Sequence, residues 1–361
     1  MSSIPIASPD LGEEEQRRVA EVIEDGHVAD GPLVRQFESE YAEYCGTDHA
    51  VATSNGTTAL HTAFEALGIG EGDRVVTTPF SFIASANAIR FAGAEPVFVD
   101  VDPETYNLDP HAVEAVARER DVDAILAVHL YGLPAAMDHL REVADDHDLA
   151  LVEDAAQAHG AEYGGQPVGS LGDAACFSFY PTKNMTTGEG GMITTDREDV
   201  AERAARFINH GRTETYEHAE VGHNFRMTSI AAAIGRAQLE KLPDNVEARR
   251  SNAATLTDAI EGVPSVTAPT EPAGREHAYH QYTVRCEDRD ALRAHLDERG
   301  IGTGVYYPLP IHQQPAYADA TASAPEAERA ADEVLSLPVH QDLDEDDLRR
   351  MTDSIHTYNH D

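Results

Sequence analysis

One lysine stands out in this chain because the residue type is almost absent from it. Lys183 lies in the segment FSFYPTKNMTTGEGGMITT, residues 177–195, and Lys241 is the only other lysine among 361 residues. A lysine amine can lose its proton when its surroundings lower its pKa and can then form a Schiff base, whereas an arginine guanidinium stays protonated. Lys183 is therefore a candidate reactive amine. A surface lysine without a chemical role, like Lys241, is the alternative interpretation.

Polar residues with possible roles in chemistry also follow a short apolar run. The run LALV, residues 149–152, leads into EDAAQAHGA, which places Asp154 at the end of a predicted strand with Gln157 and His159 just beyond it. An acidic residue in this place can be a magnesium ligand, a general base or the counter-ion of a cationic heterocycle. It can also be a helix cap that merely follows a strand.

A third segment, TSNGTTALH at residues 53–61, has the features of an anion site. Gly56, Thr57 and Thr58 open a predicted helix directly after a strand, so free backbone N–H groups, the helix dipole and two hydroxyls would face an anion. Ser and Thr also cap ordinary helices, so this segment alone leaves both interpretations open. Ser178 and Lys183 flank a turn at the end of another predicted strand, and a glycine-rich stretch follows. A phosphate site, an acid for a pyridinium nitrogen and a reactive amine together match pyridoxal phosphate.

Seven predicted strands determine where these residues lie in the fold, and they alternate with helical patterns. Strands are expected at residues 51–54, 74–78, 96–100, 124–128, 149–152, 175–179 and 191–195, and helices between the early ones include 58–67, 81–91 and 137–146. This alternation predicts an α/β fold, a largely parallel sheet covered by helices on both faces. Ligands of such sheets bind beyond the carboxyl ends of the strands.

A smaller second region is expected after Pro243, which marks a break in the helical stretch 227–242. The remainder indicates an α+β unit with strands at 280–286 and 303–308. We therefore divide the chain into a large cofactor-binding domain with an N-terminal arm at residues 1–242, and a small C-terminal α+β domain at 243–361.

The composition excludes several classes of function. A net charge of -39, from 65 acidic and 26 basic residues, disfavours nucleic-acid and anionic membrane partners. Acidic residues spread along the chain and the scarcity of lysine indicate a halophile's protein, because concentrated salt screens such self-repulsion. The sequence shows no signal peptide and no long apolar run, and its three cysteines are far apart, which predicts a cytoplasmic, reduced protein. Histidines and cysteines lack metal-binding spacing, so no metal is expected.

Several motifs in fixed order make the chain similar to one family. They are DGPLVRQFESEYAEYCG (30–46), SNGTTALHTAFEALGIGEGDRVVTTPFSFIASANAI (54–89), PVFVDVDPETYNLD (96–109), VEDAAQAHGAEYGGQPVGSLGDAACFSFYPTKNMTTGEGGMITT (152–195), HNFRMTSIAAAIGRAQLEKL (223–242) and GVYYPLPIHQQPAY (304–317). The sequence resembles the DegT/DnrJ/EryC1/StrS sugar aminotransferases, which have fold type I among pyridoxal-phosphate enzymes. The resemblance implies an aspartate-aminotransferase-like fold and a homodimer with a shared active site.

The resemblance also implies roles for individual residues. Lys183 would form the Schiff base with the cofactor and then move the proton between the cofactor carbon and the substrate carbon. Asp154 would keep the pyridine nitrogen protonated, Gln157 would contact the ring's 3-oxygen, and Phe82 would stack on the ring. The expected phosphate contacts are Gly56, Thr57, Thr58, Ser178 and, from the neighbouring subunit, Asn224. The expected borders of the sugar pocket are His159, Tyr306 and Tyr307.

The reaction implied by the resemblance is transamination. Glutamate or glutamine would convert the cofactor to pyridoxamine 5'-phosphate, which would pass the amino group to a ketone on a nucleotide-activated sugar, in amino-sugar synthesis for surface glycans. A keto-cyclitol or another ketone is an alternative acceptor. A sugar dehydratase is a further alternative, although those relatives carry histidine at the position of Lys183. A non-catalytic regulatory protein that binds the cofactor is the last alternative.

Overall fold

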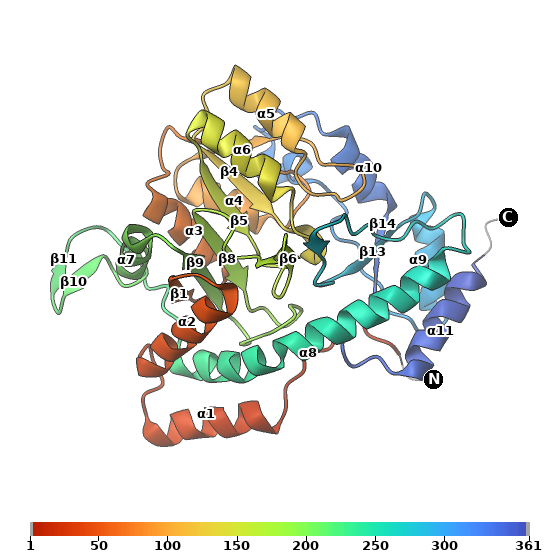
Figure 1. The fold of residues 1–361 in the computed structure, drawn as a ribbon, viewed down its shortest axis with the longest axis horizontal. Helices are drawn as coiled ribbons and strands as arrows, with labels where there is room; N and C mark the ends of the chain where they lie inside the picture. Colours follow the sequence, from red (N-terminus) through yellow and green to blue (C-terminus); the bar gives the residue numbers. More distant parts are fainter. Residues whose placement is uncertain (1–2, 359–361) are drawn as a thin grey trace.

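The computed structural model describes residues 3–358, and its centre is a sheet of seven strands (Figure 1). In sheet order, the strands are β1 (His49–Thr53), β9 (Gly191–Thr195), β8 (Ala174–Ser178), β5 (Ala150–Asp154), β4 (Ala124–Val128), β2 (Arg74–Thr77) and β3 (Glu95–Phe98). Only β9 runs against its neighbours β1 and β8. The predicted α/β class and all seven strands are confirmed, and no strand end differs from its prediction by more than two residues.

Two hydrophobic cores cover the two faces of this sheet. The pleat sends alternate side chains to opposite faces, so Ile125 of β4 enters one core and Leu126 enters the other. The helices of the first face are α2 (Pro32–Cys45), α5 (Pro110–Glu119) and α6 (Met137–His147). Those of the second face are α3 (Gly56–Leu67), α4 (Ala84–Phe91) and α7 (Glu198–Phe207). Burial on both faces explains why the strands are almost continuously apolar.

One long helix, α8 (Ser229–Ile260), joins the sheet to the C-terminal part of the chain (Figure 1). The prediction of a helical break at Pro243 is wrong, because α8 continues through this residue. A proline inside a helix costs about 3 kcal/mol relative to alanine. Leu242 is buried in the first core of the sheet and Leu256 in a C-terminal core, and each such burial contributes about 1.5–3 kcal/mol. The proposed division at residue 242 therefore falls inside a continuous helix.

The C-terminal part has a core of its own. Strand β13 (Tyr282–Arg285) pairs antiparallel with β14 (Val334–Leu337), and α9 (Arg289–Asp297) and α11 (Glu345–His356) share a core with this pair. Helix α10 (Pro325–Glu333) precedes β14 and packs its alanines into a separate cluster. Ile4 enters this core, because the N-terminal segment reaches it and bridges Ile301. The strand predicted at 303–308 does not form. Within this range only Gly304 forms a bridge to β14. The next two tyrosines, Tyr306 and Tyr307, turn toward the carboxyl edge of the central sheet. Pro308 then follows, and it has no N–H to donate to a neighbouring strand.

Shorter elements complete the fold. Helix α1 (Glu13–Asp25) packs on α8. Strands β6 (Glu162–Tyr163), β7 (Gln166–Pro167) and β12 (Arg275–Glu276) form a small sheet, and β10 (Arg212–Glu214) and β11 (Glu217–His218) form a hairpin that projects beyond α7 (Figure 1). Three single turns are 3-10 helices: η1 (Leu130–Gly132), η2 (Ile311–Gln313) and η3 (Pro315–Tyr317). Among residues 3–358, no helix has the length and apolar character needed to cross a bilayer.

Candidate active site

A cavity of about 700 Å³ lies at the carboxyl edge of the central sheet. Its wall combines the end of β5, the first turn of α3, the segment before α4 and the loop between β8 and β9. Residues 280–281 and 306–307 from the C-terminal part close it. Parallel strands end at one edge of the sheet, which is why polar residues far apart in the sequence meet there.

Asp154 ends β5 and lies at the wall of this cavity, where it is 5% exposed. Its Oδ2 accepts a hydrogen bond of 2.6 Å from the Ser85 hydroxyl, which contacts the Ser81 hydroxyl at 2.9 Å. Its Oδ1 accepts a bond of 3.2 Å from the Ala156 N–H. Burial raises the pKa of Asp154, and the Ser85 bond opposes this shift by stabilising the charged form.

Lys183 faces the same cavity from the loop after β8. Its backbone is fixed by a bond to the Tyr180 carbonyl, and the next side chain, Asn184, donates to the Ala278 carbonyl at 2.8 Å. The surrounding protein lowers the pKa of the Lys183 amine to about 8, and the nearby charge of Asp154 opposes this shift. A large fraction of the amine is therefore neutral in mildly alkaline solution, as a nucleophile requires.

The first turn of α3 forms an anion cradle in this wall. Asn55 caps the helix by accepting the N–H of Thr58 at 2.9 Å, and the Thr58 hydroxyl accepts the Asn55 N–H at 3.1 Å. These polar groups of Thr58 are engaged in the cap, so Gly56 and Thr57 are the stronger candidates for contacts to an anion. A Cβ on Gly56 would lie 2.8 Å from the Cβ of Ser178, so only glycine allows this close approach.

The residues predicted to contact the cofactor ring also line this cavity. Gln157 accepts the N–H of Tyr131 at 2.8 Å and donates to the Tyr307 hydroxyl at 3.2 Å. Phe82 is 56% exposed, and its ring centre lies 6.1 Å from that of Tyr307. Tyr306 lies beside Tyr307 in the wall. The structure thus brings together most of the sequence-predicted residues, from Gly56 to Tyr307, in one cavity.

Two predicted residues do not lie in this wall. His159 is 1% exposed, and both of its ring nitrogens are engaged, with the Tyr41 hydroxyl at 2.8 Å and the Ser178 carbonyl at 2.7 Å. His159 was expected to border the sugar pocket, but it does not line this cavity, and its ring instead contacts the backbone of Ser178. Asn224 is exposed near the end of the β10–β11 hairpin region, where it bridges Asn209 and lines no part of this chain's cavity.

Sequence reasoning missed several residues of the wall. Ser81 and Ser85 were overlooked because serines near a helix start resemble ordinary caps. His280 was overlooked because it belongs to a strand-like segment of the C-terminal part. Its Nδ1 is buried without a hydrogen-bond partner among residues 3–358, and burial lowers the pKa of the ring well below its usual value. No local signal could have placed His280 in the same cavity as Lys183, since this placement depends on packing between distant segments.

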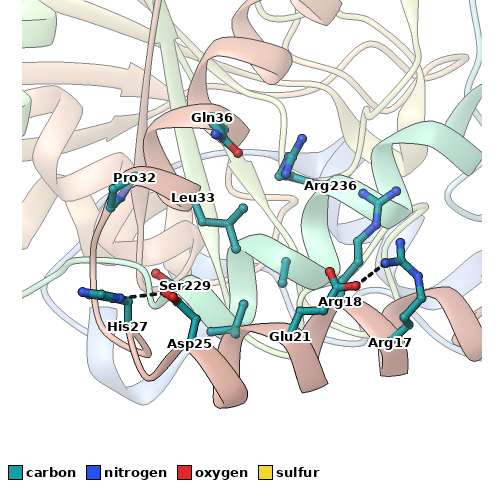
Figure 2. A pocket seen from close by; sticks show the side chains of 12 residues that line it. Arg17, Arg18, Glu21, Asp25, His27, Pro32, Leu33, Gln36, Ser229 and Arg236 are labelled. Atoms are coloured by element: carbon teal, nitrogen blue, oxygen red, sulfur yellow. Dashed lines mark hydrogen bonds and ion pairs between the residues drawn. The ribbon is translucent and has the colours of Figure 1, made fainter.

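A second cavity, of about 640 Å³, lies between α1, the start of α2 and the start of α8 (Figure 2). Three arginines line it, and each is paired with a carboxylate: Arg17 with Glu21, Arg18 with Glu240 and Arg236 with Glu40. The cavity contains neither a lysine nor a strand end. It therefore offers no group with an evident role in catalysis.

The first cavity fits pyridoxal 5'-phosphate. The glycine cradle at Gly56 and the α3 N-terminus suit the phosphate, Asp154 suits a protonated ring nitrogen, and Lys183 offers an amine for the aldehyde. The fold and this site define the class of the protein, a pyridoxal-phosphate enzyme with an aminotransferase-like α/β fold.

Comparison with known proteins gives the family. The chain matches the DegT/DnrJ/EryC1/StrS aminotransferase family over residues 9–356 and belongs to it. It is 43% identical over 351 residues to a pleiotropic regulatory protein of Geobacillus stearothermophilus, covering 96% of this chain and 94% of that protein. It is 42% identical over 354 residues to the dTDP-3-amino-3,4,6-trideoxy-alpha-D-glucose transaminase of Streptomyces venezuelae, covering 97% of this chain and 93% of that protein.

A solved structure agrees with these matches. S. venezuelae DesV in complex with a ketimine intermediate superposes with a TM-score of 0.95 at 40% identity, over 99% of this chain and 98% of that chain. The predicted family, fold and cofactor are thereby confirmed. The chain is a pyridoxal-phosphate-dependent aminotransferase.

Proposed function

We propose that this aminotransferase moves an amino group from glutamate or glutamine to the ketone of a nucleotide-activated sugar, in the synthesis of amino sugars for surface glycans. The observation that carries this proposal is the cavity that unites Lys183, Asp154 and the Gly56 cradle. Its volume of about 700 Å³ is within the range of small-molecule sites. The named activity of the Streptomyces transaminase supports a nucleotide sugar as acceptor.

When bound, pyridoxal phosphate supplies an electron sink that stabilises negative charge on the carbon beside the amino group. Lys183 Nζ would be the group that holds the cofactor's aldehyde, and as a free neutral amine it would take the proton from the substrate carbon and return it to the cofactor carbon. Burial favours this neutral amine, so the same group can accept and donate the proton near physiological pH.

Asp154 would keep the ring nitrogen protonated, and the Ser85 hydroxyl favours the charged form of Asp154 by donating to Oδ2. Gln157 is oriented by the Tyr131 N–H and would contact the ring's 3-oxygen. Phe82 would cover one face of the ring, and Gly56, Thr57 and Ser178, which line the same cavity, would hold the phosphate.

We also propose a homodimer in which each subunit completes the other's site. Lys183 and His280 are the only basic side chains in the cavity wall among residues 3–358, although a nucleotide sugar carries two phosphates. Asn224 is exposed and lies outside its own chain's cavity, which suits a contact to a partner's phosphate. The hairpin region beside Asn224 exposes two large apolar side chains, Tyr216 at 92% and Val221 at 90%. Exposed apolar groups of this kind suit a contact with a second subunit.

The surface charge supports a protein that works in concentrated salt inside the cell. A net charge of -39 favours expansion of the chain at low ionic strength. Three buried free cysteines suit a reducing compartment.

We also propose two domains, at residues 1–242 and 243–361. Helix α8 is shared by both, because the division falls inside this helix.

The test is a transamination assay with purified enzyme, glutamate or glutamine, and a panel of dTDP- and UDP-linked keto sugars, with the amino sugar detected by mass spectrometry. We expect turnover with at least one nucleotide sugar and none for Lys183→Ala. A matched Lys241→Ala variant, which changes the only other lysine, should retain activity. Turnover with a keto-cyclitol alone would replace the proposed acceptor, and turnover by Lys183→Ala would refute the mechanism.

Dimerisation needs a separate test. Lys183→Ala and Asn224→Ala are each expected to be inactive, because one removes the amine and the other removes the contact to the partner's site. Mixing the two variants under conditions that exchange subunits should restore partial activity, because some mixed dimers contain one intact site. An inactive mixture whose subunits have exchanged, or a monomer by light scattering, would refute the shared site.

A further inference from the structure

Three potential metal ligands meet on the outer surface of the first face of the sheet. His111 and Glu114 lie three residues apart in α5, so they occupy one side of that helix. His139 lies in the first turn of α6. The ligand atoms of these three residues all lie within 4.8 Å of one another, and the two imidazole rings are 4.8 Å apart at their centres with an angle of 80° between their planes.

The backbone positions of this cluster are held by packing. Helices α5 and α6 contact each other (Figure 1), and they bury Val113 and Leu140 in the same core. The Asp109 side chain caps α5 by accepting the N–H of His111 at 3.0 Å. The three ligand side chains remain accessible, because His111 is exposed and the other two are half-buried. Water and ions can therefore reach them without any change in the fold.

We propose that His111, Glu114 and His139 form a binding site for a divalent first-row transition ion such as zinc. Two imidazoles and one carboxylate are ligands that this class of ion prefers, and a water molecule would complete a four-coordinate site. Bonds of about 2.0–2.2 Å around a tetrahedral ion place ligand atoms roughly 3.4 Å apart. Closing the cluster from at most 4.8 Å needs only side-chain rotations.

Two features of the surroundings bear on the affinity of this site. Arg118 pairs with Oε1 of Glu114 from the next turn of α5, which leaves Oε2 for the ion. The exposed Arg118 can remain in place as a partner that orients the carboxylate. The strongly acidic chain also attracts cations to its surface. The sequence-based expectation of no metal site considered spacings within single segments of histidines and cysteines, whereas this cluster joins residues of two helices.

None of the three residues lines the catalytic cavity. The ion is therefore expected to link α5 to α6 and to take no part in transamination. Binding to the folded state alone would raise the folded-to-unfolded ratio about a hundredfold at an ion concentration one hundred times Kd. This rise would appear as a higher Tm. It should be absent from variants that lack the cluster.

The experiment is calorimetric titration of zinc chloride into chelator-treated, dialysed holoenzyme, together with thermal unfolding in the presence and absence of zinc. We expect one equivalent of zinc that is lost in His139→Gln and in His111→Gln and weakened at least tenfold in Glu114→Gln. His147→Gln, on the same helix as His139, and Glu119→Gln, on the same helix as Glu114, are matched controls and should bind as the unaltered protein does.

Circular dichroism and transamination should be unchanged in all five variants, which separates loss of the ion from loss of the fold. Saturable binding that persists unchanged in His139→Gln and His111→Gln would place the ion elsewhere and overturn the proposal. The absence of any saturable zinc binding to the unaltered holoenzyme would overturn it as well. Neither result would bear on the proposed sugar substrate.

Discussion

Ser85→Ala is the most informative single perturbation of the catalytic cavity. Ser85 donates a bond of 2.6 Å to Asp154, and both side chains are buried. A hydrogen bond to a charged group contributes about 1.5–3 kcal/mol. At about 1.4 kcal/mol for each factor of ten, its loss corresponds to roughly a 10- to 150-fold change in an equilibrium constant. We expect the dissociation constant for pyridoxal phosphate to rise by this amount.

The sign of the pH dependence follows from the same bond. Ser85 lowers the pKa of Asp154 against the effect of burial. Its removal therefore raises this pKa further, and the carboxylate that pairs with the ring nitrogen is lost as the pH falls. The affinity defect should be largest in mildly acidic buffer and should shrink as the pH rises. Fluorescence titration of the apo-protein with pyridoxal phosphate across a pH series would measure both effects.

Two control variants separate this mechanism from a general disturbance of the site. Ser81→Ala removes a hydroxyl that contacts Ser85 but not Asp154, so its effect should be smaller. Ser85→Thr keeps the hydroxyl and should restore most of the affinity. An affinity in Ser85→Ala equal to that of the unaltered protein at every pH would refute the assigned role. So would equal defects in the two alanine variants.

Further predictions concern the phosphate cradle, the reactive amine, the long helix and salt. Gly56→Ala should weaken cofactor binding about tenfold, because overpacking against Ser178 costs roughly 1–3 kcal/mol; an unchanged Kd by titration would show that the cradle tolerates a methyl group. Covalent capture of pyridoxal phosphate by the apo-protein should accelerate as the pH rises and level off above about 8, where Lys183 is neutral, as measured by stopped-flow absorbance; a flat profile would contradict this. Pro243→Ala, at an exposed position inside α8, should stabilise the protein by about 1–3 kcal/mol without changing turnover, and a lower Tm would show that proline is favoured there. Stability should fall in dilute buffer, as unfolding and light scattering across a potassium chloride series would reveal; a dimer equally stable without salt would refute adaptation to high salt.

The sequence predicted the central sheet well because its signals are local. Short apolar runs and helical spacing identified all seven strands, and strand ends identified Asp154 and Lys183. It failed where long-range packing outweighed local preference. Pro243 lies inside a helix because both cores bury that helix, and residues 303–308 form a single bridge because their tyrosines belong to the cavity.

Side-chain roles followed the same division. His159 follows a strand that ends at the ligand edge, yet its two ring nitrogens bond Tyr41 and Ser178 behind the cavity. Local sequence gives the position of the backbone and cannot tell which way a ring points, because that depends on partners from distant segments. Ser85, His280 and the histidines of α5 and α6 carry no local signal for the same reason.

The sequence by itself determined the α/β class, the order of strands along the chain, the candidate for the reactive lysine and the family. These properties depend on periodicity, residue chemistry and motifs within short segments. Only the tertiary structure decided that Ser85 bonds Asp154, that Thr58 belongs to a cap, that α8 is continuous and that three potential metal ligands from two helices meet. Each of these depends on distances between residues that folding, and not chain order, brings together.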